Sequence, residues 1–510
     1  MIEKYYSGVI EQIYNRIGKE TRNIVMANYS NDFSIENLEV IRRYQSNEDN
    51  VFFAYSEFSY NTLVGAYEPF LDIICNMHRH FIGGSFDDFQ RECGVYYLHR
   101  QVLNSYYETG ECFREETVLL NEVAYEQRRM TKAIVDMLKR LSEVRPLMIV
   151  INRFQMASKS SIETIKYLID NPCTNIGIVL GVNVQVKGTD STVEVWDRIV
   201  ESLEDRSAIY YIGSAGQQKN HIRDTSDDEL YITTNFEQSI QEASNIMEFL
   251  DYEQARRGCR IIEHKIKFED AWIDEKSLRR FYLIYARTSV LLGEMSKAIE
   301  LTNEYKALIP ESDSEHYFSI YYFMKGTCYM YQGKLEKAEG CAKKAYDYAL
   351  LADDELLEFK SELLSVMIKM SGWYNIFFCV QDIPVSDEFI EKIIKHGYRN
   401  HLAHIYIYAY DNSRDVVKQS FYDESLLKHF TKGLELAKKI ENEQLVYDAY
   451  QKTIMLASTN GLNEIAFLYV IRTYEFMKEH GNIYVARVLT AIGYNLSAMG
   501  KNELVDDYYN

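Results

Sequence analysis

The stretch GTCYMYQGKLEKAEGCAKKA, which runs from Gly326 to Ala345, decides the fold of the second half of this chain. Small or signature residues stand at offsets 0, 3, 7, 12, 16 and 19 of this stretch, at Gly326, Tyr329, Gly333, Ala338, Ala342 and Ala345. We expect small side chains there because the two helices of a repeat hairpin cross closely, and bulky ones would hold them apart. The stretch therefore predicts one helical hairpin of a repeat protein.

The same pattern recurs along the second half of the chain. Gly293, Gly333 and Gly372 lie 40 and then 39 residues apart, and Gly461 and Gly500 are again 39 apart. Further signature positions are Ala298, Ala466 and Gly493. The pattern resembles the tetratricopeptide repeat, at a period above that repeat's usual length. It predicts an all-α solenoid of five or six hairpins over residues 276–510, a class of structure that binds other molecules along a concave face.

Composition sets limits on the class of protein. A chain of 510 residues is too long for one core, so two or three domains are expected. The net charge of −20 argues against a nucleic-acid partner. Eight cysteines without a CxxC pair, and the absence of an apolar run of ~20 residues, predict a cytoplasmic protein without a membrane span. The 42 tyrosines suggest an AT-rich bacterial genome.

Residues 1–213 have a different periodicity from the repeats. Short apolar runs predict strands at Asn23–Ala27, Val51–Tyr55, Leu147–Ile151, Ile176–Leu180 and Ala208–Ile212. Helices are expected between them, at about 34–45, 66–80, 115–143, 159–170 and 192–203. Continuous apolar runs are typical of strands buried on both faces of a parallel sheet. The pattern predicts an α/β three-layer domain over 1–213, then a linker and connecting helices over 214–275.

An α/β domain before helical repeats resembles the signal-transduction ATPases with numerous domains (STAND), a P-loop family. In such proteins the first strand runs into GxxxxGK[ST], whose backbone amides hold phosphate. Here Asn23–Ala27 runs into a segment in which Ala27 and Asp32 replace the glycines and Phe33 replaces the lysine, while Ser34 matches. Asp32 would repel phosphate, and Phe33 removes the cation. The resemblance therefore implies a degenerate nucleotide site.

The second motif of that family is a buried strand that ends in an acidic residue bound to magnesium. Here the strand LMIVI is followed by Asn152 and Arg153. An amide lacks the anionic oxygen that magnesium prefers, and Arg153 would compete with the metal. We therefore expect no catalytic residues, no cofactor, no metal and no ATP hydrolysis. An α/β domain that never bound nucleotide is the alternative.

Other candidate sites are weaker. His78 and His80 stand two apart on a predicted helix and point in different directions, so a surface cluster is expected. Glu122 and Glu126 have no partner base or metal-binding histidine nearby in the sequence, and are expected in solvent.

These features predict the regulatory or sensor part of a bacterial signal-transduction protein, whose repeats bind a protein, peptide or small ligand. The arrangement resembles the front part of multidomain diguanylate cyclases and of maltose-activator-type transcription regulators. The chain has neither a GGDEF-type signature nor a basic helix-turn-helix, so it is expected not to be an enzyme, with any output domain outside it. The alternatives are an active non-standard STAND NTPase and a non-catalytic scaffold for a protein complex.

The last repeat is expected to be incomplete. Gly493 and Gly500 would mark its first helix, and Glu503–Tyr509 would begin the second before the chain stops at Asn510. Because solenoids normally end in a capping helix, we expect this chain to be a fragment of a longer product.

Overall fold

The computed structural model describes residues 2–30, 38–46, 51–59, 63–114, 116, 118–186, 193–212, 236–268, 273–374, 385–408, 424–440, 442–459, 461–480, 493, 496–497 and 499–501. The chain divides into two compact units, Met1–Leu308 and Ile309–Asn510, which are described separately below. The domain divisions predicted at 213 and 275 stay predictions, and residues 213–235 lie outside the described part of the chain.

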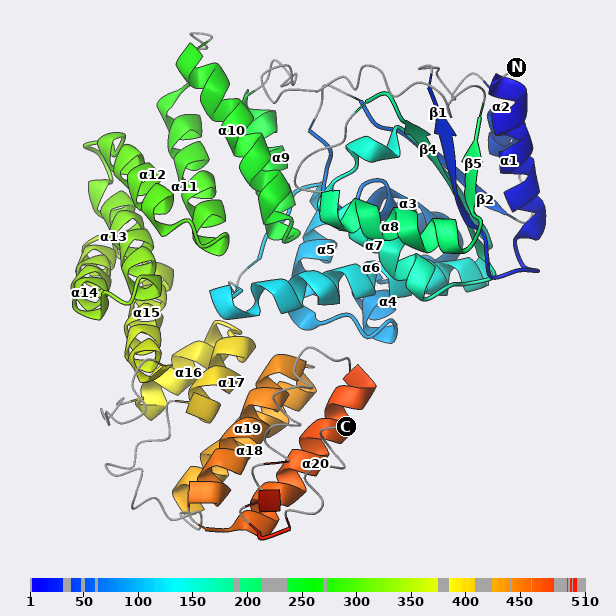
Figure 1. Ribbon diagram of the computed structural model, residues 1–510. Coiled ribbons are helices and arrows are strands. Elements are labelled where there is room, and N and C mark those ends of the chain that lie inside the picture. The colour runs from blue at the N-terminus through cyan, green and yellow to red at the C-terminus, as the bar shows by residue number, and fades with distance from the viewer. Residues whose placement is uncertain are drawn as a thin grey trace. The chain divides into compact units, whose positions relative to one another are not determined.

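A five-stranded parallel sheet forms the centre of the first unit (Figure 1). Its strands are β1 (Ile24–Tyr29), β2 (Phe52–Glu57), β3 (Leu147–Asn152), β4 (Ile176–Asn183) and β5 (Ile209–Tyr211). They lie in the order β2-β3-β4-β1-β5. Every residue of β3 and β4 is buried, as expected for central strands covered on both faces. Each strand overlaps one of the five predicted runs, so the predicted α/β domain with a parallel sheet is confirmed.

Helices cover both faces of this sheet (Figure 1). On one face, α1 (Ile2–Arg16) and α2 (Glu39–Ser46) share a buried apolar cluster with alternate residues of β1, β3 and β4. The other face is covered by α6 (Val123–Val144), α7 (Lys159–Asp170) and α8 (Val193–Asp205). The right-handed crossovers of parallel strands produce this division, because connections that run in opposite directions along the sheet fall on opposite faces.

The connection from β2 to β3 contains several helices. Before α6 it contains α3 (Phe70–Met77), the π-helix η1 (His78–Ile82), α4 (Phe86–Glu92), α5 (Tyr97–Thr109) and the short η2 (Leu120–Glu122). The helix predicted over 66–80 thus begins only at Phe70, and α4 and α5 were not predicted. Two helical hairpins complete the first unit: α9 (Phe236–Glu248) with α10 (Tyr252–Phe268), and α11 (Glu275–Leu291) with α12 (Met295–Ala307).

The second unit is helical throughout its described residues. Its helices are α13 (Ser314–Tyr331), α14 (Leu335–Leu351), α15 (Glu355–Tyr374), α16 (Asp387–Lys395), α17 (Arg399–Tyr408), α18 (Glu424–Lys439), α19 (Glu443–Thr459) and α20 (Asn463–His480). Buried apolar side chains connect α13, α14 and α15, and a further cluster connects α15, α16 and α17. Across the described helices of the chain, none is long and apolar enough to cross a membrane.

Most of the glycines that recur every 39 or 40 residues lie at the C-terminal ends of helices. They do not lie where two helices cross. Gly293, Gly333, Gly461 and Gly500 have φ between +70° and +77°, a conformation that favours glycine. After each, the next N–H bonds to the carbonyl five residues back, as Lys334 N does to Tyr329 O at 2.9 Å. A Cβ at Gly333 would have no neighbour within 4 Å. The expectation of close helix contact at Gly333 is therefore wrong, and Gly372 lies inside α15 and not in a turn.

Close contact between helices depends on Gly326 of α13. A Cβ at this position would lie 3.1 Å from Leu364 Cδ2 and 3.3 Å from Cys341 Cβ. Alanines complete the contact faces of the hairpins: Ala298, Ala338, Ala345 and Ala466 are all fully buried. The small residues of the motif thus have two separate roles, since some permit helix packing and others permit a left-handed turn.

Gly326→Leu should lower the free energy of unfolding by about 1 to 3 kcal/mol, because leucine overpacks the contact between α13, α14 and α15. The matched control is Gly340→Leu on α14, an exposed helical position where a Cβ would meet nothing within 4 Å. Leucine there should be neutral or stabilise by up to about 1 kcal/mol through helix propensity. Urea unfolding followed by circular dichroism measures both, and equal effects would contradict the assigned contact.

Candidate functional site

The candidate site lies beyond the carboxyl ends of β1 and β4. From β1 the chain crosses to β2 at one edge of the sheet, and from β4 it crosses to β5 at the other edge. Connections that diverge from adjacent strands open a crevice at their carboxyl ends, where open α/β sheets bind ligands. The last residues of four neighbouring strands meet this edge: Tyr29, Asn183, Asn152 and Glu57.

β1 continues two residues beyond the predicted strand. Asn28 and Tyr29 extend the parallel ladder against Val182 and Asn183 of β4. Ala27 is therefore a fully buried residue in the interior of the strand, and not the first residue of a loop after it. The other predicted residues of the phosphate loop, Asp32, Phe33 and Ser34, lie outside the described residues, and their roles stay predictions.

Asn152, at the position where the resemblance places a magnesium-binding acid, is already bonded to the protein. The Tyr29 hydroxyl donates to Asn152 Oδ1 at 2.6 Å, and both side chains are fully buried. The bond passes over β4 at Gly181, where a Cβ would lie 2.8 Å from Asn152 Oδ1 and 2.5 Å from the hydroxyl of Tyr6. Burial raises the pKa of Tyr6 well above its ordinary value, so this hydroxyl stays neutral. The space over β4 is thus occupied by neutral side chains.

Arg153 is paired with the carboxylate that ends β2. Its Nη1 lies 3.1 Å from Glu57 Oε1 and donates to the carbonyl of Phe58 at 3.4 Å. The Tyr55 hydroxyl also donates to the Glu57 carboxylate. Arg153 has a φ of +56°, which is uncommon for a residue with a side chain, and such conformations often occur at functional sites. The negative charge at this edge is therefore balanced by a fixed guanidinium.

Serines after β3 connect this edge to a loop of the α/β domain. The short η3 (Phe154–Met156) leads into α7, whose N-cap is Ser158. Ser160 Oγ accepts a hydrogen bond from Tyr67 N at 3.0 Å, and Ser161 Oγ donates to Glu68 O at 2.8 Å. The first turn of α7 thus fixes the loop that precedes α3.

The buried carboxylate of Asp251 accepts hydrogen bonds at the N-termini of two helices. Its Oδ2 accepts from Ser160 N at 3.0 Å in α7, and its Oδ1 accepts from Gln254 N at 3.4 Å in α10. Both helix ends favour a negative charge. Burial raises the pKa of Asp251, and the bonds from Ser160 and Gln254 act in the opposite direction. Gln254 Nε2 also donates to Val64 O at 3.0 Å, so the turn between α9 and α10 is fixed to the α/β domain.

Two groups expected at the surface are buried. Glu122 and Glu126 are each 1% exposed. His99 Nε2 lies 3.0 Å from Glu126 Oε2, and Arg129 Nη1 lies 3.4 Å from Oε1 of the same carboxylate. Burial lowers the pKa of His99 to about 4, so its ring is neutral at pH 7. His78 is also fully buried, which corrects the expected surface cluster. Within the described part of the chain, no three His, Cys, Asp or Glu residues could hold a metal ion.

Some functional residues that were not predicted from the sequence do have a recognisable local pattern. Glu57 ends an apolar strand, and Asp251 precedes Gln254 with the spacing of a helix N-terminal capping box. The bond from Tyr29 to Asn152 had no such signal, because the two residues are 123 positions apart in the sequence.

Comparison with known proteins leaves the family open. No protein-family model matches the chain, and no curated protein matches its sequence. Among solved structures, the chain is similar to the crystal structure of a Signal Transduction ATPase with Numerous Domains (STAND) protein with a tetratricopeptide repeat sensor from Pyrococcus horikoshii. The identity is 12%, the match covers 98% of this chain and 87% of that chain, and the TM-score is 0.43. A similarity at this TM-score assigns no function to the residues of the chain.

Asp251→Asn should lower the free energy of unfolding by about 1 to 3 kcal/mol, because an amide can accept only one of the two backbone bonds and turns its NH2 toward the other donor. Glu253→Gln is the matched control in the same turn. Glu253 pairs with Lys159 at 3.1 Å but is about a third exposed, so its loss should cost at most about 1 kcal/mol. Urea unfolding of both variants tests this, and a Glu253 variant as unstable as the Asp251 variant would contradict it.

Proposed function

We propose that this chain is the regulatory part of a bacterial, cytoplasmic signal-transduction protein of the STAND type. Its helical repeats bind a protein, peptide or small ligand, and its α/β domain serves as a docking or clamping surface without hydrolysing ATP. The main support for this proposal is a pair of interactions at the sheet edge. Tyr29 donates a hydrogen bond to Asn152, and Glu57 forms an ion pair with Arg153.

The chemistry of the sheet edge argues against hydrolysis. Magnesium binds through carboxylates and dehydrates reluctantly, so a neutral amide at Asn152 is a poor substitute for an acid. Of the residues that the structure describes at the strand ends, Glu57 is the carboxylate, and the guanidinium of Arg153 would have to leave before a metal could use it. Among the described residues, an edge whose carboxylate is already paired can still form a protein–protein contact, which needs no metal.

The repeats contain aromatic side chains suited to binding. Phe318 and Tyr322 of α13 both stack on Tyr348 of α14, with ring centroids 5.2 Å and 5.6 Å apart. Lys344 lies over the ring of Tyr322 at 5.2 Å. Half-buried aromatic rings with a polar end are enriched at interfaces because they bury area at little entropic cost. These residues support a binding function for the hairpin of α13 and α14.

We expect the purified chain to release phosphate from Mg·ATP no faster than buffer alone. If an active non-standard hydrolase is the correct alternative, Glu57 is the carboxylate among the described strand ends that could act as metal ligand or base. Phosphate release should then be abolished by Glu57→Gln and preserved in Glu201→Gln, a matched charge removal on the exposed side of α8. That outcome would overturn the proposed function.

A second experiment separates a sensor from a scaffold. A stable stoichiometric partner, together with a melting temperature that no small molecule changes, would favour a non-catalytic scaffold. A rise in melting temperature with a peptide or small ligand would favour the sensor, because binding to the folded state alone stabilises it.

A further inference from the structure

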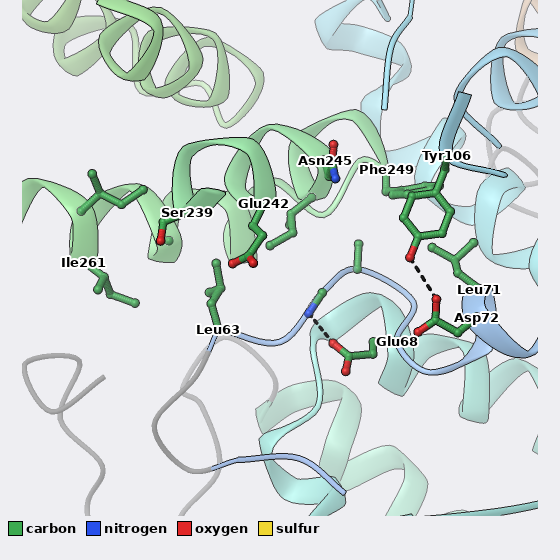
Figure 2. Close-up of a pocket in the computed structure, with 15 residues that line it drawn as sticks. Leu63, Glu68, Leu71, Asp72, Tyr106, Ser239, Glu242, Asn245, Phe249 and Ile261 are labelled. Carbon is green, nitrogen blue, oxygen red and sulfur yellow. Dashed lines mark hydrogen bonds between the residues drawn. The ribbon is translucent and has the colours of Figure 1, made fainter. Parts of the chain in front are cut away.

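A pocket of about 310 Å³ lies in the first unit, between the loop before α3 and the hairpin of α9 and α10 (Figure 2). Its apolar lining comes from both sides: Leu63, Leu71, Ile246, Phe249, Ile261 and Ile262. Gly258 of α10 brings the helix close to the loop, since a Cβ there would lie 2.7 Å from Leu63 Cδ2. The volume is at the lower end of the range for small-molecule sites, and such sites combine apolar walls with a few polar groups.

Three carboxylates also line this pocket. Glu68 and Asp72 come from the α/β domain, and Glu242 comes from α9 on the opposite side (Figure 2). Each accepts a hydrogen bond from a neutral donor: Gly65 N at 2.8 Å, Tyr106 OH at 3.1 Å and Gln238 Nε2 at 3.2 Å, respectively. Among the described residues that line the pocket, none is a lysine, arginine or histidine. The pocket thus combines an apolar body with uncompensated negative charge.

The environment of these carboxylates favours a cation. Burial raises the pKa of Glu68, and the charges of Asp72 and Glu242 raise it further. Burial also raises the pKa of Glu242. Glu68 and Glu242 are partly buried and Asp72 is exposed, and like charges held close together in a partly buried site are costly until a cation compensates them. A metal ion is the weaker candidate, because no three acidic, histidine or cysteine side chains of the described residues gather closely enough to hold one.

We propose that this pocket binds a small organic amine. Its ammonium group lies beside Glu68 and Glu242, and its apolar part lies against Leu71 and Phe249 on one side of these carboxylates (Figure 2). Because the volume is at the lower end of the range for small-molecule sites, a small amine such as hexylamine is a suitable probe. The proposal goes beyond the proposed function, since it places a small-ligand site in the first unit and outside the repeats. If the amine does not bind, the proposed function of the repeats and the sheet edge is therefore unaffected, and the reverse also holds.

Isothermal titration calorimetry of the full chain with hexylamine, hexanol and hexanoate tests the charge requirement. Hexylamine should bind with a stoichiometry of one, at least tenfold more tightly than hexanol, and hexanoate should not bind. Equal affinity for hexylamine and hexanol would identify a purely apolar slot and overturn the proposal, as would no binding of hexylamine.

Charge-neutral variants locate the site. Glu242→Gln and Glu68→Gln should each weaken hexylamine binding at least fivefold and leave hexanol binding unchanged. Glutamine at 68 can still accept the bond from Gly65 N, and Glu242 lies on a different element, so at least one variant should fold. Glu201→Gln removes the same charge from the exposed side of α8 and should leave hexylamine affinity unchanged. Similar losses in all three variants would show a long-range effect of net charge, and would contradict the assigned site.

Discussion

The arrangement of the first unit depends on one buried carboxylate, that of Asp251. Its two oxygens accept backbone N–H groups from the first turns of α7 and α10, two helices that belong to different parts of this unit. A buried carboxylate is stable only when such donors compensate it. Removing it would leave Ser160 N and Gln254 N without this acceptor, and would weaken the attachment of the α9–α10 hairpin to the sheet domain.

The hydrogen bonds of Asp251 connect the sheet edge with the pocket that Glu68, Asp72 and Glu242 line. β3 ends at Asn152, and the first turn of α7 follows within a few residues. That turn binds the loop at Tyr67 and Glu68 on one side and Asp251 on the other. Glu68 also lines the pocket. A ligand that shifts this loop would act on α7 directly and, through it, on the carboxyl end of β3. Such coupling needs no bound nucleotide, which agrees with an edge occupied by its own side chains.

The sequence predicted the sheet and the helical repeats well because both depend on local patterns. Buried apolar runs located all five strands. The periodic glycines located the turns of three hairpins, at Gly293, Gly333 and Gly461, but not Gly372, which lies inside α15. Long-range contacts had no such pattern. The packing role assigned to Gly333 was wrong because left-handed turns and close crossings both select glycine, and spacing alone does not separate them. Glu126 was expected in solvent, because its contact with His99 joins two different helices and leaves no local pattern in the sequence. In the structure, His99 of α5 and Arg129 of α6 both lie beside its carboxylate.

We propose that paired side chains at the sheet edge stand where a P-loop protein binds magnesium and nucleotide. Titration of the purified chain with Mg·ATP by isothermal calorimetry tests it most directly. We expect no saturable heat of binding, because Asn152 and Glu57 already have protein partners. A micromolar dissociation constant for Mg·ATP would contradict it.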